Sequence, residues 1–265
     1  MDRPPPQAQV ADHLPLISNR FLYILTALVA VLATLSGAIS LAGRWMGEQM
    51  SLAGHTDSSE TFTITIGQDR LRLTANTMRF EEQRKNGAAE RADLYFLWPE
   101  MAGYSTGLRA RFDDLDLLDG LIFVQLTQST MSRDMSGRVE PIYQHLYDGP
   151  ADKGPHGLVR HRLKSETGYG KEVLLTAPRP GQPDYAVRCI IPDESAPASS
   201  GDCQRDIHVG RDLTILYRFS SKLLGDWSSI DQAIRTQIEA SLRPGAEVAP
   251  QLRKIGRTEA TNDSS

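Results

Sequence analysis

The most hydrophobic segment of this chain runs from Phe21 to Gly43 and contains no charged residue. As an α-helix it would be roughly 35 Å long, and the hydrocarbon core of a bilayer is about 30 Å thick. The pattern therefore predicts one transmembrane helix over residues 21–43, which would anchor the protein in a lipid bilayer. A cleaved signal peptide is the alternative, because small residues near Ala38 and Ala42 would suit a peptidase. The length favours a retained helix, since the hydrophobic region of a signal peptide has about 7–15 residues.

Downstream of this segment, apolar and polar residues alternate in short stretches, which is the pattern of β-strands. The alternation in residues 61–75 is interrupted at Gly67 and predicts a β-hairpin with one solvent-exposed face. Two denser apolar runs, ADLYFLWP and GLIFVQLTQ, predict buried central strands. Shorter strands separated by polar loops are predicted in GLVRHRLK, KEVLLTA, YAVRC and RDLTILYRF.

Helical spacing is clear only near the end of the chain, in DWSSIDQAIRTQIEASLRPG. Ser228 and Asp231 match a capping-box pattern at its start, and Pro244 marks its end. The segment predicts a helix that docks on a sheet, with a partner-binding helix as the alternative. Its apolar stripe consists of Ile230, Ala233, Ile234, Ile238 and Leu242.

These elements together predict an α+β fold that is mostly antiparallel β, sandwich-like or with a curved sheet, and ends in a C-terminal amphipathic helix. Polar composition at both ends of the chain predicts tails without a core. The predicted organisation is a cytoplasmic polar tail (1–20), the transmembrane helix (21–43), a juxtamembrane linker (44–60), a β-rich extracytoplasmic domain (61–243) and a disordered tail (244–265).

The charges that flank the apolar segment predict its orientation. Arg3 and Arg20 precede it, whereas Arg44 alone follows it closely. Lysine and arginine near a membrane span remain in the cytoplasm, so we expect a single-pass protein of the inner membrane with its C-terminal domain in the periplasm. This arrangement is broadly similar to that of single-pass inner-membrane proteins of Gram-negative bacteria, although no motif matches a family of known activity.

The chain contains two cysteines, Cys189 and Cys203. Each falls on the apolar side of a predicted strand, and the segment between them is rich in proline, serine and acidic residues, as in a loop. A disulfide between Cys189 and Cys203 would close the base of this hairpin and would need an oxidising compartment. Two free buried thiols are the alternative. The spacing is not that of a CxxC redox or zinc motif.

The histidines offer little chemistry by their sequence context. His145, Asp148 and His156 share one polar loop, but their spacing matches no metal-ligand pattern such as HExxH. His161 shares the apolar side of its strand, which predicts a hydrogen-bonded core histidine. His55 precedes the predicted folded region and falls in the linker.

Acidic residues crowd the segment RFDDLDLLDG, from Asp113 to Asp119. Leucines interrupt the alternating oxygen ligands that a calcium loop requires. A helix explains the segment better, with the acids on one side and an apolar side formed by Leu115, Leu118 and Leu121. We therefore predict no catalytic residue, no metal ligand and no cofactor.

The overall charge excludes one class of partner. The 265 residues carry 29 basic and 33 acidic side chains, a net charge of -4, and no basic face for nucleic acid is indicated. Without a nucleophile or phosphate motif, we predict a non-catalytic binding or assembly role, with the lipid bilayer and other envelope proteins as partners. The alternatives are a hydrolase-like envelope enzyme, using His145, His156 or the Asp113–Asp119 cluster, and a sensory input domain that acts through a membrane partner.

Overall fold

The computed structural model describes residues 19–52, 54–114, 117–169, 171–192 and 198–243. The chain divides into two compact units, one ending at Gly54 and one beginning at His55. The predicted C-terminal tail lies outside the described residues, and so does the predicted N-terminal tail except for Asn19 and Arg20.

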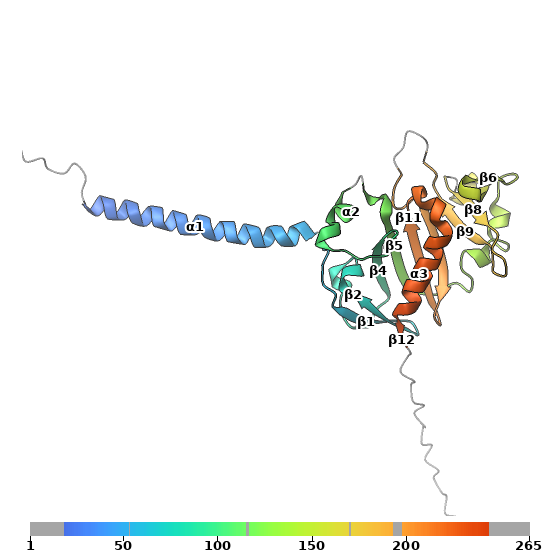
Figure 1. The fold of residues 1–265 in the computed structure, drawn as a ribbon, viewed down its shortest axis with the longest axis horizontal. Helices are drawn as coiled ribbons and strands as arrows, with labels where there is room; N and C mark the ends of the chain where they lie inside the picture. The colour runs from blue at the N-terminus through green and yellow to red at the C-terminus, as the bar shows by residue number, and fades with distance from the viewer. Residues whose placement is uncertain (1–18, 53, 115–116, 170, 193–197, 244–265) are drawn as a thin grey trace, which may run out of the picture. The chain divides into compact units, whose positions relative to one another are not determined.

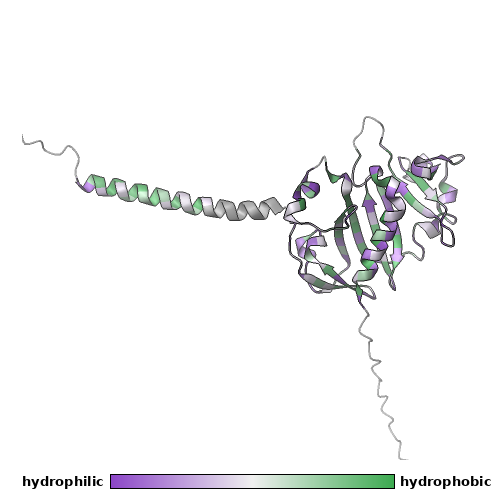
Figure 2. Cartoon of the chain, viewed as in Figure 1, coloured by the Kyte–Doolittle hydropathy of each residue, from purple (hydrophilic) through white to green (hydrophobic). Residues whose placement is uncertain are grey.

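The first unit contains one long helix, α1 (Asn19–Leu52) (Figure 1). Its segment Asn19–Ser40 is apolar (Figure 2), with a mean hydropathy of 2.2, and none of it is buried against other parts of the protein. By length and composition this helix could span a membrane. The helix continues to Leu52, so the first part of the predicted linker is helical.

The second unit contains two sheets, and most strand pairs in both are antiparallel (Figure 1). The smaller sheet has the order β12-β2-β1-β3 and the larger sheet has the order β4-β5-β11-β10-β9-β8-β7-β6. The predicted α+β class with a C-terminal helix is confirmed. The helices of this unit are α2 (Arg109–Asp113) and α3 (Trp227–Ser241), and the strands are β1 (Thr61–Ile66), β2 (Asp69–Thr74), β3 (Gly87–Ala88), β4 (Arg91–Leu97), β5 (Leu121–Gln128), β6 (Asp152–Lys153), β7 (Val159–Arg162), β8 (Val173–Ala177), β9 (Tyr185–Cys189), β10 (Cys203–Val209), β11 (Leu213–Phe219) and β12 (Leu242–Arg243).

Two hairpin turns, one from each sheet, hold each other by reciprocal hydrogen bonds. The carboxylate of Asp69 accepts the backbone N–H of Arg211, at 3.0 Å, and of Asp212, at 2.9 Å. The carboxylate of Asp212 in turn accepts the backbone N–H of Gln68 at 2.9 Å. Gly67 adopts a φ of 56° beside Asp212, where an added Cβ would lie only 2.7 Å from a carboxylate oxygen. Glycine is therefore required both for the turn and for the close approach of the second hairpin.

Helix α3 packs on the sheets through the apolar stripe that its spacing predicts. Ile230, Ile234 and Ile238 are each at most 1% exposed and belong to one core with residues of both sheets. The predicted capping box is wrong, because the helix begins at Trp227 and Asp231 faces the core instead of the helix start. The Asp231 carboxylate accepts hydrogen bonds from Arg205 and Tyr217, which are fully buried.

Two details of the predicted elements are also wrong. Strand β4 lies beside β5 at an edge of the larger sheet, although its run of apolar residues predicts a central strand. Its side chains Leu94 and Phe96 are nevertheless buried, because they belong to the core that the two sheets share. The helix predicted over the acidic segment is not continuous, because α2 ends at Asp113 and Leu121 already belongs to β5.

The structure places the two cysteines at the base of the β9–β10 hairpin. Cys189 and Cys203 are direct partners in the register of the two strands, and both are fully buried. Their sulfur atoms lie at disulfide distance, 2.07 Å. The predicted antiparallel pair with both cysteines on its apolar face is therefore confirmed.

We predict that this pair is oxidised in the native protein. Peptide mapping without reductant should recover Cys189 and Cys203 in one linked species. Replacing both with alanine should lower the free energy of unfolding by about 3 kcal/mol in the loop-entropy description. Alkylation of both thiols in fresh membranes without reductant would contradict the prediction and would weaken the case for an oxidising compartment.

Candidate interaction surface

The two loop histidines that sequence analysis singled out have different neighbours. His145 is exposed, and its backbone carbonyl accepts a hydrogen bond from Lys164 Nζ at 3.1 Å. His156 is also exposed and lies beside Gly225. Among the described residues, no group of three or more His, Cys, Asp or Glu side chains could hold a metal ion.

The acidic segment is used for ion pairs within the fold. Asp119 pairs with Lys222, and Asp113 pairs with Arg109 at 3.1 Å and lies 3.3 Å from His55. These contacts place Asp113 and Asp119 with different partners on different elements. Asp113 therefore forms its contacts at α2, and Asp119 forms its ion pair just before β5.

His55 lies inside the folded unit, so its prediction as a linker residue is wrong. Its ring stacks on Tyr104 at a centroid distance of 4.7 Å, and its Nδ1 lies 2.9 Å from the Tyr95 hydroxyl. Burial lowers the pKa of His55 below its ordinary value, against the opposing effect of Asp113, and burial raises the pKa of Tyr95 to about 12. The Glu60 carbonyl also accepts the Ala75 N–H at 2.7 Å. The compact unit thus starts several residues before the predicted boundary at residue 61.

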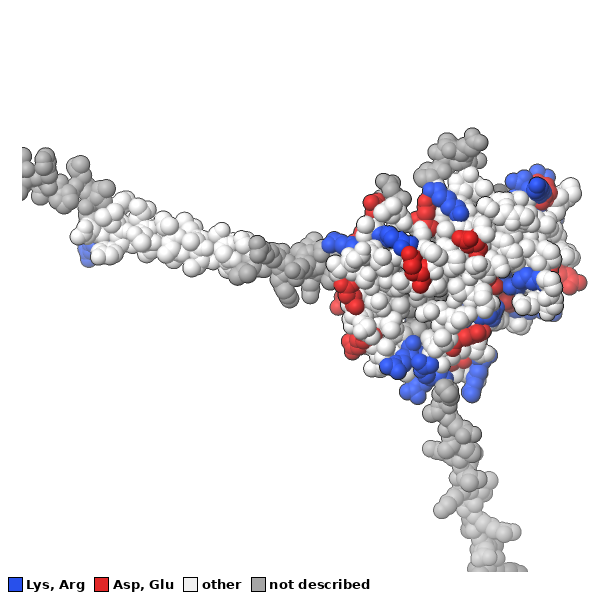
Figure 3. All heavy atoms as spheres, viewed as in Figure 1, with Lys and Arg blue, Asp and Glu red and all other residues white. Residues whose placement is uncertain are grey.

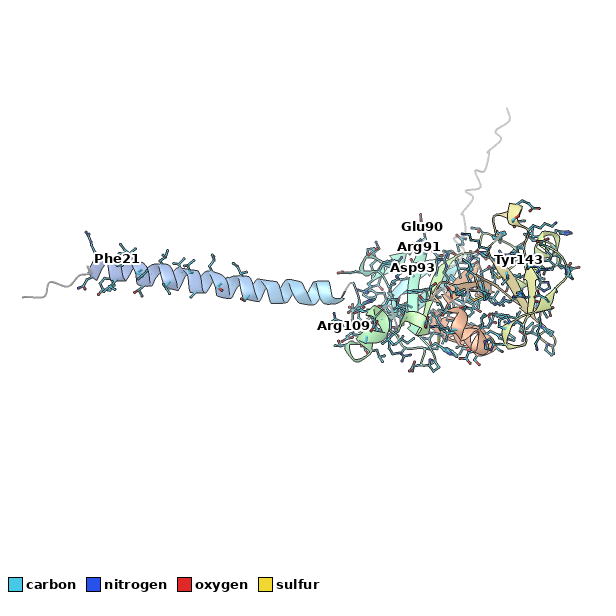
Figure 4. All side chains as sticks on the ribbon, turned by 90° about the horizontal axis from the view of Figure 1, so that it is seen from above. Phe21, Glu90, Arg91, Asp93, Arg109 and Tyr143 are labelled. Atoms are coloured by element: carbon cyan, nitrogen blue, oxygen red, sulfur yellow. A yellow bond between two sulfur atoms is a disulfide. The ribbon has the colours of Figure 1, made fainter. Side chains whose placement is uncertain are left out.

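The larger sheet has two faces with different surroundings. Its inner face belongs to the same core as α3. On its outer face, the half formed by β8 and β9 is covered by the segment between β5 and β8, through a second apolar cluster of Met135, Tyr143, Leu163, Leu174 and Ala186. The half formed by β4, β5, β11 and β10 carries two surface cavities instead. Figure 4 shows Arg91 and Asp93, both on β4, on the side of the sheet opposite to α3.

We call this half the open face, although Arg138 of the segment between β5 and β8 reaches Asp206 at its β10 side. The strand register places its side chains in rows across four strands, for example Asp93, Gln125, Leu216 and Asp206. The two cavities have volumes of about 260 Å³ and about 200 Å³ and share Gln125 and Leu216, so they adjoin. The outward residues of the open face are Arg91, Asp93, Phe123, Gln125, Thr127, Thr214, Leu216, Arg218, Asp206 and His208.

The larger cavity is rich in guanidinium groups. It is lined by Arg79, Arg91 and Arg218, with Asp93 as its carboxylate. Arg91 pairs with Asp93 at 2.9 Å, and the Arg79 guanidinium lies 4.8 Å from the centre of the Phe123 ring. Among the described residues, neither Arg79 nor Arg218 forms an ion pair, so two cations of this cavity remain available to an anion.

The smaller cavity has a balanced charge. Arg138 and Asp206 line it as an ion pair, with side chains 13% and 12% exposed. His208 Nε2 lies 3.0 Å from Ser129 Oγ, and Ser129 Oγ lies 2.7 Å from Thr214 Oγ1.

In the Ser129–His208 contact, a serine hydroxyl lies beside an imidazole, the group that acts as the base in serine hydrolases. A nucleophile of this kind also needs a third group that orients the imidazole, and in the described part of the chain Asp206, the carboxylate of this cavity, is held by Arg138. The contact therefore fits a hydrogen-bonding surface better than a hydrolytic site.

Sequence reasoning missed the open face, although the strand alternation identifies its outward residues. The alternation does not show which half of the face is covered. That depends on where the segment between β5 and β8 folds back, through contacts of Met135 and Tyr143 that no local pattern reveals.

No protein-family model matches the sequence, and no curated protein matches it. An immunity protein of the Stenotrophomonas maltophilia type IV secretion system has a TM-score of 0.48 at 16% identity, over 72% of this chain and 96% of that chain. The Neisseria meningitidis iron-regulated outer membrane lipoprotein FrpD has a TM-score of 0.44 at 9% identity, over 71% of this chain and 95% of that chain. Both likenesses concern the fold alone.

Proposed function

We propose that this chain is a non-catalytic, membrane-anchored binding protein of the cell envelope, and that the open face receives a protein partner. The observation that carries the proposal is the pair of adjoining cavities on a sheet face where charged, polar and apolar side chains alternate. Specific protein interfaces combine an apolar centre with a polar rim and with arginine and aromatic residues. Phe123 and Leu216 are half-buried among arginines here, which is this combination.

The proposed location is the inner membrane, crossed once by α1, with the folded unit in the periplasm. The apolar helix over Asn19–Ser40 supports an anchor, and the excess of arginine on its N-terminal side supports a cytoplasmic N-terminus. The paired cysteines support an oxidising compartment for the folded unit.

The orientation is tested by a reporter that is active only outside the cytoplasm. We expect alkaline phosphatase fused after residue 245 to be active, and the mature protein to keep residues 1–20. An inactive fusion would contradict the orientation. A mature chain beginning near Leu41 or Gly43 would show a cleaved signal peptide instead.

The binding role is tested by photo-crosslinking in native membranes. A photoreactive residue at Thr127, on the open face, should form discrete adducts with other envelope proteins. The matched control is Thr236, which is exposed on α3, on the face where acidic and basic side chains are interspersed (Figure 3). Equal adducts from both positions, or none from Thr127 in a folded and abundant protein, would contradict the proposal.

A further inference from the structure

We propose that the larger cavity of the open face binds an acidic side chain from an extended segment of a partner protein. This inference rests on the proposed function and adds the chemistry of the ligand. It starts from the charge of the cavity, where three guanidinium groups surround one carboxylate. Because Arg91 already pairs with Asp93, the cations that remain for a ligand are Arg79 and Arg218.

The position of Arg79 favours a planar anion. Its guanidinium lies 5.0 Å from the Phe80 ring centre and 4.8 Å from that of Phe123, and such contacts hold the side chain in place. A cation that is already positioned loses less conformational freedom on binding. Guanidinium groups also bind carboxylates through two parallel hydrogen bonds, which makes arginine well suited to this ligand.

Arg218 lines the same cavity as Arg79 and Phe123. It is the cross-strand partner of Phe123 in the β5–β11 register, and it is exposed. Arg79 and Arg218 therefore line one cavity together with the Phe123 ring. A carboxylate between them would receive two charged donors, and the apolar part of its side chain would lie on Phe123.

A protein segment explains the rest of the face better than an anionic membrane surface does. The other charges that line the two cavities are paired, Arg91 with Asp93 and Arg138 with Asp206, so the face lacks the larger cluster of cations that an anionic membrane surface attracts. Neighbouring strands are about 4.8 Å apart, so four strands span about 14 Å. An extended peptide covers that width with about four or five residues. The acidic residue would occupy the larger cavity, and polar or apolar residues would follow over Leu216.

The inference is tested with random eight-residue peptides displayed on phage, selected on the full chain in nanodiscs of zwitterionic lipid. We expect selected peptides to be enriched in aspartate or glutamate. The variant Arg218→Glu should bind a selected peptide at least about tenfold more weakly, because a charged hydrogen bond is lost and a like charge is added. The variant Arg79→Glu should do the same, which gives a second route if one variant folds poorly. The control Arg70→Glu changes an exposed arginine on β2 of the smaller sheet and should bind as the parent does.

Three results would overturn the inference: selection without acidic enrichment, equal binding by Arg218→Glu, or vesicles of phosphatidylglycerol that bind the protein through Arg218 in preference to peptide. Its failure is distinguishable from failure of the proposed function. Adducts from Thr127 together with peptides that lack acidic residues would overturn only the acidic ligand, whereas the absence of both would overturn both proposals.

Discussion

Replacing Asp231 with alanine is expected to lower the free energy of unfolding by about 3–5 kcal/mol, the cost of leaving a buried charge without its partner. The carboxylate of Asp231 accepts hydrogen bonds from Arg205 Nε at 2.8 Å, Arg179 Nη1 at 2.9 Å and the Tyr217 hydroxyl at 2.7 Å. Arg205 is fully buried. Its remaining bonds are to neutral acceptors, Ser136 Oγ and a backbone carbonyl, which would not compensate its charge.

The measurement is chemical unfolding of the full chain in detergent, followed by tryptophan fluorescence. Glu239→Ala is the matched control on the same helix, because Glu239 is exposed and its pair with Arg235 is long, at 3.8 Å; its effect should be within about 0.5 kcal/mol. A loss below about 1 kcal/mol for Asp231→Ala would contradict the prediction. The double change Asp231→Leu and Arg205→Met should recover stability, since apolar residues often replace a buried ion pair without loss.

The same network predicts how stability responds to acid. Burial alone would raise the pKa of Asp231, but Arg205, Tyr217 and Arg179 hold it below its ordinary value of 3.8. Because the folded pKa is depressed, the contribution of Asp231 is complete above the unfolded pKa and is lost as the pH falls through the folded value. The parent should therefore lose stability below about pH 4, and Asp231→Ala should lose less over that range.

The two central charges of this network stand at apolar positions of the sequence pattern. Arg205 alternates in phase with Cys203 and Ile207, so its position on β10 is an apolar one. Asp231 lies three residues before Ile234 on the buried stripe of α3. An arginine and an aspartate at buried positions of a strand and a helix predict a buried ion pair between Arg205 and Asp231. The capping-box pattern assigns Asp231 to the start of the helix instead, and so it does not predict this ion pair.

Local patterns predicted most elements because each depends on neighbours in the sequence. The hairpin at Gly67, the paired cysteine strands and the stripe of α3 follow from spacing alone. The edge position of β4 and the place of His55 depend on contacts between distant segments, such as the stacking of His55 on Tyr104. The open face depends on where a long connection folds back. No periodicity within one element carries that information.

Replacing Ile234 with alanine is expected to lower the free energy of unfolding by about 2–5 kcal/mol, because the lost methylenes leave a cavity that the surroundings fill only in part. Ile234 is fully buried at the middle of the α3 stripe, in the core that joins helix and sheets. Gln237→Ala is the matched control, since Gln237 is exposed on the same helix and alanine favours helix; its effect should be within about 0.5 kcal/mol. Unfolding of the full chain in detergent measures both. Equal stability of Ile234→Ala and the parent would contradict the docking of α3 on the sheets through Ile234. It would favour the alternative, in which α3 binds a partner.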